Sequence, residues 1–593
     1  MRSLLFAATC AVVAVVGSSD SLVAQNSTRK IRPEPSELAA KAGSWVNWRE
    51  DLDAALAESK ESGKPVFWYV PTLFRSPMDR QVEIDRYMMA GPFSWPDCID
   101  ALNERFIPVR QAATRAQMEA FEGLRPGSFI EPGFLVLDGE SEVLAKWDEI
   151  TTLHPEWWRA RLNEALSSVE APLIDKRWRA LYLIPDVDAG SMSSPMDKFS
   201  FAASSWERGD EKDAAREWTE FAETFAGHPL AAKAMAEAEG HGPIVNGFES
   251  LNPFEGEGWF DASARGTKSP QNDWTPDSLQ FHHWHFFQAM QRGHGGFVDS
   301  RYDFGGTDSL PNVHVAVTSL VARALLEWSA DPELAQTLGS DLMFKAIPFL
   351  ANDENLNLDD SDELVWAYLY RMELRHRWLQ LHPGSKAEVL PKLEEDHAAL
   401  VAMQTERGAW SHEYPNPFVT ASVLIALGNN REHGVETDSL VVSKAIGFLK
   451  TCRTEEGAIT YGAPRGGRAR AAVPAGVGRM PLVEHALIVW GEGSQEALAR
   501  AIEASFENEE ELFRVRKYDD HASRLGYGGF FFWYDLKARW EALQVLEDEE
   551  KREAWMAKQH ERILTLPEFD GCFVDSHELG RSYGTAMAWL SGL

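Results

Sequence analysis

Residues 404–427 read QTERGAWSHEYPNPFVTASVLIAL, and this stretch decides the fold of the second half of the chain. Gln404 is followed by a turn of small residues at Gly408, and Trp410 comes directly after that turn. A short loop broken by prolines then leads into an apolar segment that starts at Phe418, with its small and apolar residues at helical spacing. The stretch therefore predicts a turn, an aromatic anchor, a loop and a buried helix, in that order.

The same order recurs in weaker form along the rest of this half. Turns of glycine with an apolar or aromatic residue lie at 295, 457, 528 and 571, and a helical pattern follows each of them. A sixth, degenerate copy runs from Asn355 to Asp360, before a helix expected at Ser361–Leu379. The interval drifts around roughly 50 residues with two helices per unit, which is typical of a helical repeat array whose units must stack to cover their apolar faces. An ordinary helical domain with several glycine–aromatic turns is the alternative.

The element Q-x-x-x-G-[GA]-[WF] followed by a helix, present at Gln404–Trp410 and Gln291–Phe297, resembles the repeat of the prenyltransferase and squalene-cyclase superfamily. The resemblance covers residues 270–593. It implies an all-α α/α toroid, in which helical hairpins close into a ring. In that family the glutamine and the aromatic ring connect one hairpin to the next, so the resemblance marks the fold and not a catalytic site.

The net charge and the N-terminal residues of the chain predict which partners are excluded and where the protein is located. The 593 residues carry a net charge of −33, whereas nucleic acids and anionic membranes attract a basic face, so we expect neither as a partner. An apolar run from Leu4 to Val16, followed by small residues up to Ala24, predicts a secretory signal at 1–24, with an uncleaved anchor as the alternative. No later stretch is long and apolar enough to span a bilayer. We therefore expect an exported protein, periplasmic or extracellular, with no stable membrane span after cleavage.

Residues 44–170 alternate helical and strand patterns. Strands are expected at Val66–Val70, Arg105–Arg110, Phe134–Leu137 and Glu142–Lys146, the last two joined by a turn, which predicts a small α/β sheet. This order resembles the thioredoxin-like fold, and the resemblance rests on motifs such as Gly63-Lys64-Pro65-Val66 and Glu131-Pro132-Gly133-Phe134. It places Pro132 at the family's cis-proline, beside a groove that holds an extended peptide in such folds.

The redox motif of that family is missing. Counting from Lys64-Pro65, the C-x-x-C should fall at Arg75-Ser76-Pro77-Met78, where both cysteines are replaced. Thiol–disulfide exchange needs a thiolate to attack and a second thiol to resolve, so we expect no such activity. Cys98, Cys452 and Cys572 are far apart and form no disulfide framework, although one bridge with one thiol left over remains open. We expect no cofactor and no metal.

Residues 195–240 predict helices around a turn at Gly209-Asp210, and their pattern resembles a single tetratricopeptide-type (TPR-like) hairpin. One copy does not make an array, so a connector between the two larger parts is the expected role. The segment from Gly240 to Gly266, rich in Gly and Asn, is the expected boundary before the toroid.

Acidic residues at 359–363 are the first candidate for chemistry. Asp360 and Asp362, with Glu363, depart by one residue from the D-x-D-D box with which squalene-type cyclases protonate an alkene. A carboxylate pair in a dry cavity can have one raised pKa and act as a proton donor. The simpler interpretation is that these acids cap a helix, because Asp360 and Glu363 have capping-box spacing.

Two other clusters carry polar and aromatic side chains. His412, Glu413 and Tyr414, next to Trp410, are residue types that suit sugar binding or the proton transfer of a polysaccharide lyase. His282 and His285 share a helical face, yet no carboxylate or cysteine lies at ligand spacing, which favours a packed histidine face over a metal site.

The first functional hypothesis is a non-redox binding or scaffold protein, which contacts a protein or small-molecule ligand through the toroid cavity, Trp410 or the groove near Pro132. The alternative is an enzyme that acts in the toroid, either cyclase-like with Asp360, Asp362 and Glu363, or lyase-like with His412 and Tyr414. A cyclase would show an apolar cavity with Asp362 inside, and a lyase an open polar groove at His412.

Overall fold

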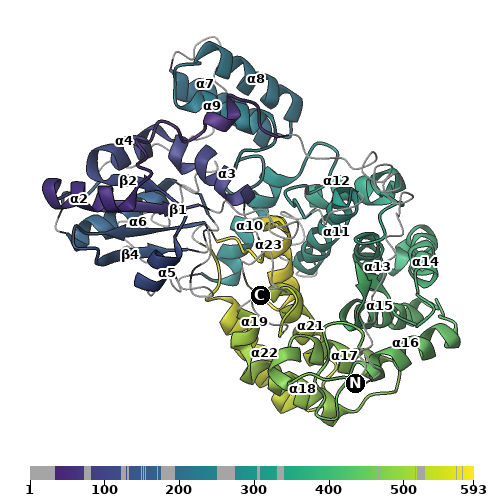
Figure 1. Cartoon of the computed structure of the whole chain (residues 1–593). Helices are drawn as coiled ribbons and strands as arrows, with labels where there is room; N and C mark the ends of the chain where they lie inside the picture. Colours follow the sequence, from purple (N-terminus) through teal and green to yellow (C-terminus); the bar gives the residue numbers. More distant parts are fainter. Residues whose placement is uncertain are drawn as a thin grey trace, which may run out of the picture.

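The computed structural model combines a small mixed α/β sheet in the first half of the chain with a largely helical second half (Figure 1). The expected secretory signal and residues 75–78 lie outside the described part. The structure describes residues 34–71, 82–121, 124, 129, 132–148, 150, 152–153, 155–169, 171–174, 194–249, 274–302, 308–329, 340–464, 468–513, 516, 528–568, 571–576 and 578–593.

The sheet has four strands in the order β2-β1-β3-β4. β1 runs parallel to β2 and antiparallel to β3, so that Val66 faces Ile107 on one side and Leu137 on the other, and β4 pairs antiparallel with β3. β1 and β3 are buried along their whole length, which explains their uninterrupted apolar sequences. The bounds are β1 (Val66–Val70), β2 (Ile107–Arg110), β3 (Gly133–Leu137) and β4 (Val143–Trp147).

Alternate residues of the sheet face two different cores. Phe67, Tyr69 and Phe134 pack into a core that includes residues of α4 and α6, whereas Trp68 and Leu135 pack with residues of α2 on the opposite face. The sheet is therefore covered on both faces. Its helices are α2 (Leu52–Ser62), α3 (Val82–Ala90), α4 (Pro96–Arg105), α5 (Arg115–Ala120) and α6 (Pro155–Ser168), with short 3₁₀ turns η1 (Ala39–Lys41) and η2 (Pro92–Ser94).

Three helices form the connector above the sheet in Figure 1. α7 (Pro195–Glu207) packs on α8 (Glu211–Thr224), and α8 packs on α9 (Leu230–Ala238). Gly209 has a φ of 85° at the first turn, a conformation that glycine adopts at no steric cost. The core of the connector is continuous with one face of the sheet, because Phe199, Trp218 and Phe221 belong to the same cluster as Phe67.

Six inner helices of the second half contact one another in a closed cycle. α11 packs on α13, α13 on α15, α15 on α17, α17 on α21, α21 on α23, and α23 returns to α11 (Figure 1). Each begins after one of the six turns that the sequence predicted, including the degenerate one. The inner helices are α11 (Leu310–Ser329), α13 (Leu364–Leu381), α15 (Pro417–Asn429), α17 (Arg479–Val489), α21 (Phe532–Gln544) and α23 (Gly580–Leu590).

A second set of helices packs outside this cycle, each against one inner helix except α18, which packs against both α17 and α21. Short elements connect the two sets. The outer helices are α10 (Pro276–Met290), α12 (Ser340–Ala351), α14 (Lys386–Ala402), α16 (Ser439–Thr451), α18 (Gln495–Glu507) and α22 (Glu549–Ile563); the connecting elements are η5 (Asp353–Asn355), η6 (Pro383–Ser385), β5 (Ser411–His412), β6 (Tyr414–Pro415), η7 (Asn430–His433), η8 (Val473–Gly476) and α19 (Glu509–Phe513).

The glutamines of the two strongest repeats bridge neighbouring hairpins. The Gln404 side-chain amide donates to the carbonyl of Gly408 in its own turn (3.1 Å) and to the carbonyl of Val441 on α16 (2.8 Å). Gln291 repeats this pattern with Gly295 (3.0 Å) and with Leu342 on α12 (2.8 Å). The role that the family resemblance implied for these glutamines is thus present in the structure.

A threonine on the following inner helix completes the turn. Thr420 Oγ1 accepts a hydrogen bond from the backbone N–H of Trp410 (3.0 Å). Thr318 does the same for Phe297 (2.9 Å), and Thr585 for Phe573 (3.1 Å). These threonines are additional members of the repeat, which the sequence analysis missed because their distance from the turn varies.

Residues 241–249, the first part of the expected boundary, are buried and bonded to both halves. The Phe248 carbonyl accepts from the N–H of Leu153, beside the sheet, and the Gly247 carbonyl accepts from Arg581 on α23 (3.1 Å). This part of the segment is therefore a packed joint. None of the helices that the structure describes is both long and apolar enough to cross a bilayer.

Candidate functional site

The inner helices present their two ends to two different sites. Residues from the N-terminal halves of α11, α13, α21 and α23 surround a narrow aromatic space, whereas the C-terminal ends of all six inner helices surround a much larger cavity. The helices of the cycle therefore point the same way. Every residue that the sequence proposed for catalysis belongs to the first end or its surface.

His412 and Glu363 form a buried pair at the aromatic end. Nδ1 of His412 lies 3.3 Å from the Glu363 carboxylate, and Nε2 lies 3.3 Å from the hydroxyl of Tyr302. The Tyr302 ring stacks on the imidazole, and Trp366 meets it edge-on. Glu363 enters this space because it is the last residue before α13.

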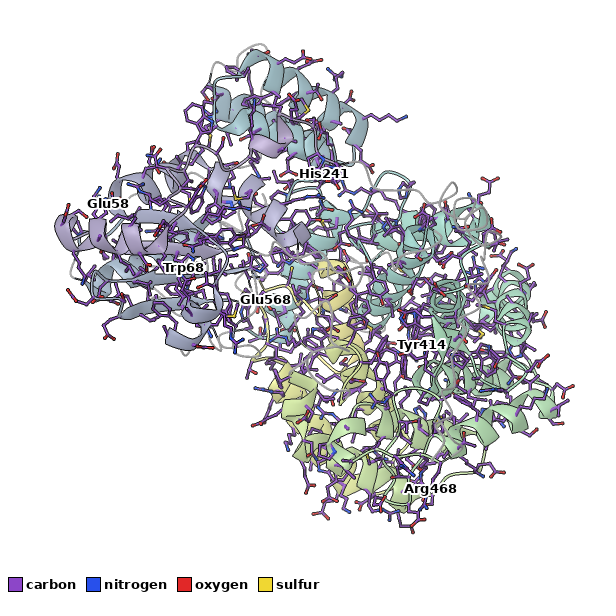
Figure 2. The ribbon with its side chains drawn as sticks, in the orientation of Figure 1. Glu58, Trp68, His241, Tyr414, Arg468 and Glu568 are labelled. Atoms are coloured by element: carbon purple, nitrogen blue, oxygen red, sulfur yellow. The ribbon has the colours of Figure 1, made fainter. Side chains whose placement is uncertain are left out.

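A strained turn places His412 inside. Glu413 has a φ of 63°, which is uncommon for a residue other than glycine, and it separates the two-residue strands β5 and β6. His412 on β5 is buried, while Tyr414 on β6 has 43% of its surface exposed. Tyr414 is labelled in Figure 2. The hairpin thus divides the predicted cluster, with the histidine in the interior and the tyrosine on the surface.

The carboxylates change the protonation of His412. Burial alone lowers the pKa of His412, but Glu363 and, more weakly, Glu413 raise it, and the resulting pKa is about 9. The raised pKa favours the protonated form of His412 beside the Glu363 side chain, inside an apolar shell. Such a pair can donate a proton, yet the space beside it measures only about 50 Å³, room for a few water molecules.

Asp360 holds the turn that precedes α13, but it does not cap the helix as the capping-box spacing predicted, because the N-cap residue of α13 is Glu363 and no side-chain cap hydrogen bond is present there. Asp360 is buried and accepts hydrogen bonds from the Asn312 amide (2.8 Å) and from the backbone N–H groups of Asp362 (3.0 Å) and Glu363 (3.3 Å). Burial raises the pKa of Asp360, and the bond from Asn312 opposes that rise. Asp362 lines neither cavity, and among the described residues that line the aromatic space Glu363 is the acidic one.

Trp410 and Pro132 are both buried. The Trp410 indole N–H donates to the Leu400 carbonyl on α14 (2.6 Å), which fixes the ring as an anchor between helices. Pro132 directly precedes β3, and residues 75–78, where the redox motif of the resemblance would fall, lie outside the described part.

Cys98, Cys452 and Cys572 are buried and form no disulfide with one another. Burial, with the neighbouring Asp97, raises the pKa of Cys98 well above its ordinary value, and burial raises that of Cys452 to about 11.

The histidines of α10 serve packing, since His283 accepts from Trp589 Nε1 (2.8 Å) and lies 2.8 Å from the Gly571 carbonyl.

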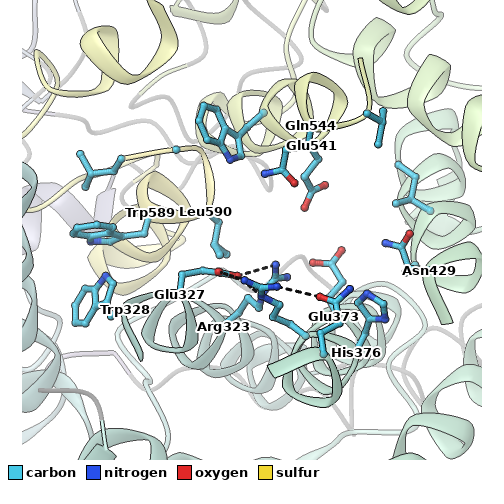
Figure 3. Close-up of a pocket in the computed structure, with 18 of the residues that line it drawn as sticks. Arg323, Glu327, Trp328, Glu373, His376, Asn429, Glu541, Gln544, Trp589 and Leu590 are labelled. Atoms are coloured by element: carbon cyan, nitrogen blue, oxygen red, sulfur yellow. Dashed lines mark hydrogen bonds and ion pairs between the residues drawn. The ribbon is translucent and has the colours of Figure 1, made fainter. Parts of the chain in front are cut away.

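The larger cavity has a volume of about 650 Å³ and lies where the C-terminal ends of the inner helices converge (Figure 3). This volume is within the range of small-molecule binding sites. Its wall offers amides, carboxylates, guanidinium groups and the edges of tryptophans. The polar members are Gln280, Gln380, Asn429, Asn430 and Gln544, the charged ones Asp277, Arg323, Glu327, Glu373, Arg377, Glu432 and Glu541, and the tryptophans Trp328, Trp540 and Trp589.

Most charges of this wall are matched within it. Glu327 accepts from both Arg323 (3.1 Å) and Arg377 (2.7 Å), as Figure 3 shows for Arg323. Lys537 lies between Glu373 (3.1 Å) and Glu541 (2.7 Å). Three cations are therefore paired with three carboxylates, which leaves the carboxylates of Asp277 and Glu432 as the excess charge of the lining. The carbonyl ends of the inner helices add partial negative charge.

Three buried polar atoms of uncharged side chains on the same wall lack a hydrogen-bond partner among the described residues. They are Trp328 Nε1, Asn430 Oδ1 and His485 Nδ1. Burial lowers the pKa of His485 to about 4, so its ring is neutral at pH 7. Because buried polar groups are normally satisfied, this wall is suited to a bound polar molecule or water.

The sequence analysis missed this cavity. Arg323, Glu327, Glu373 and Glu541 lie in the C-terminal halves of α11, α13 and α21, but α13 and α21 contain other charged residues, so no local pattern singled these four out. Their convergence depends on ring closure, which brings residues far apart in the chain to one point. A scan with protein-family models and a search of curated proteins found no match to this chain.

Proposed function

We propose that the chain is an exported, non-redox binding protein whose helical half is an α/α toroid and whose ligand occupies the 650 Å³ cavity. The toroid assignment is supported by the closed cycle of inner helices and by the glutamine bridges of Gln291 and Gln404. A thioredoxin-like fold for residues 44–170 is supported by the mixed sheet order β2-β1-β3-β4.

The observation that carries the proposal is the cavity wall. A surface on which donors and acceptors alternate favours a ligand with many hydrogen-bonding groups, because every buried polar group left unpaired costs free energy. The excess of carboxylate and the helix C-termini disfavour an anion. The ligand class is therefore a saccharide-sized molecule rich in hydroxyl groups, uncharged or carrying an amine.

The proposal that the protein has no redox activity rests on the state of its cysteine thiols. The attacking species in disulfide exchange is a thiolate, whereas Cys98 is fully buried with a raised pKa.

The alternative function, an enzyme at the aromatic end, is favoured by one observation, the His412–Glu363 pair. The space beside that pair is too small for a terpenoid or a sugar ring without rearrangement.

Calorimetric titration with three matched disaccharides tests the proposal: one built from glucosamine, one from glucose and one containing glucuronate. We expect the amine-bearing compound to bind most tightly and the acidic one least. Asn429, exposed on the cavity wall, allows a blocking variant, Asn429→Trp, which should abolish binding. Glu503→Trp, at an exposed position of α18 outside the lining, should leave it unchanged.

Two results would contradict the proposal. One is that no disaccharide binds the wild-type protein better than it binds Asn429→Trp. The other is that His412→Gln, at the opposite end, removes binding while Asn429→Trp keeps it, which would move the site to the aromatic space.

A further inference from the structure

Two histidines and a glutamate from distant parts of the chain meet beside the large cavity. His376 lies on α13, while Glu432 and His433 lie on η7. His433 Nε2 is 3.0 Å from His376 Nδ1, and the Glu432 carboxylate is 3.9 Å from His376 Nε2. One donor atom from each residue can be chosen so that all three lie within 4.8 Å of one another. His376 and Glu432 also line the cavity.

These separations suit a small divalent ion. Zinc binds histidine nitrogen and carboxylate oxygen at about 2.0–2.2 Å in a tetrahedron, which places its ligands about 3.3 Å apart. The 3.0 Å between His433 Nε2 and His376 Nδ1 is close to that value. The 3.9 Å contact of Glu432 is with the other ring nitrogen of His376, so the Glu432 side chain, which is 57% exposed, must turn to bind the same ion. Three protein ligands leave the fourth position for water or for a molecule in the cavity.

The residues next to His376, Glu432 and His433 also support a metal site. Gln380 donates to the Glu432 carboxylate (2.9 Å), the kind of outer contact that orients a metal ligand. Arg323 and Arg377 lie close enough to affect His376 and would repel a cation, but both guanidinium groups are bonded to Glu327. Their charge is thus partly compensated at the site.

We propose that His376, Glu432 and His433 bind one divalent transition-metal ion, with zinc the best fit, at the wall of the cavity. This inference departs from the sequence-based expectation of no metal, which could not detect ligands 57 positions apart. It goes beyond the proposed ligand site and needs no organic ligand, so the two can fail separately.

Metal titration of the untagged chain, after dialysis against a chelator, tests the site. Co²⁺ is the spectroscopic probe and Zn²⁺ the competitor. We expect about one equivalent per chain, with the absorption of a tetrahedral nitrogen–oxygen site that Zn²⁺ removes. His376→Ala and His433→Ala should each weaken Co²⁺ binding by at least roughly tenfold, and Glu432→Gln should weaken it less.

His382→Ala is the matched control, because His382 is an exposed histidine at the end of the same helix. It should bind Co²⁺ as the wild type does. Circular dichroism of each variant reports whether the fold is kept, and His433→Gln replaces His433→Ala if the latter unfolds. The proposal is wrong if the wild-type protein binds no more Co²⁺ than the His376→Ala/His433→Ala double variant. The two rings would then form only an imidazole–imidazole hydrogen bond.

Discussion

At the scale of single residues, the buried His412–Glu363 pair makes stability depend on pH. The pKa of His412 is about 9 in the folded protein, above the ordinary 6.5 of an unfolded histidine. A proton held more tightly by the folded state stabilises it, and this stabilisation is complete below pH 6.5 and lost as pH rises towards 9.

Replacing Glu363 with glutamine tests this dependence. The wild type should exceed Glu363→Gln in free energy of unfolding at pH 6, and the difference should shrink by up to about 3 kcal/mol by pH 10. Urea unfolding followed by circular dichroism at several pH values measures the difference, with Glu354→Gln, at an exposed position, as the control. A difference that stays constant from pH 6 to pH 10 would show that the pair does not hold the proton.

Single residues also show where sequence reasoning stops. Trp410 and Gln404 were identified from a local motif, because a turn and its anchor are close in the chain. Glu373 and Glu541 share Lys537, yet they lie on different helices and no local pattern connects them. The sequence could therefore predict the anchors of the fold but not the wall of the cavity.

At the scale of elements, the glycine of each strong repeat is fixed by two constraints. Gly408 has a φ of 85°, and a Cβ atom there would lie 2.5 Å from the backbone of Lys444 on α16. Gly434 has nearly the same φ, 87°, with open space around it. The two positions separate the cost of backbone conformation from the cost of helix packing.

Alanine at both positions measures those costs. Gly434→Ala should lower the free energy of unfolding by about 1–2 kcal/mol, the cost of a left-handed residue. Gly408→Ala should lower it by about 2 kcal/mol more, because α16 must move away from the turn. Thermal and urea unfolding compare the variants directly. Equal losses of unfolding free energy in Gly408→Ala and Gly434→Ala would mean that the turn at Gly408 does not pack against α16.

The glutamine bridge gives a second prediction for the same turn. Gln404→Ala leaves the carbonyls of Gly408 and Val441 without their donor and should cost about 2 kcal/mol of unfolding free energy. Gln404→Glu should be worse at pH 7, since a carboxylate cannot donate to two carbonyl oxygens. Urea unfolding of both variants is the measurement, and a glutamate variant as stable as the wild type would contradict the bridge.

At the scale of the whole molecule, one buried lysine connects the helical connector to the sheet half. Lys233 on α9 is fully buried and donates to Glu237 (3.1 Å), Glu249 (2.6 Å) and the carbonyl of Ala90 at the end of α3 (3.0 Å). The order of the elements was predictable from hydrophobic patterning. This joint was not, because the glycine-rich sequence around 240–249 is typical of a linker.

Lys233→Met should lower the free energy of unfolding by about 3–5 kcal/mol, because it leaves two buried carboxylates without their cation. Adding Glu237→Gln and Glu249→Gln should recover part of that loss by removing the unpaired charges. Lys212→Met, at an exposed position of α8, should change little. Differential scanning calorimetry measures all three, and a stable Lys233→Met protein would contradict the role of the joint.

Hydrogen exchange with mass spectrometry, with and without the glucosamine disaccharide, tests the central claim that the ligand binds where the inner helices end. We predict slower exchange in 323–329, 373–381 and 541–545, no change around 363–366 and 411–414, and no protection in Asn429→Trp. Protection at 363–366 and 411–414 with none at the helix C-termini would contradict the claim and place the site at His412.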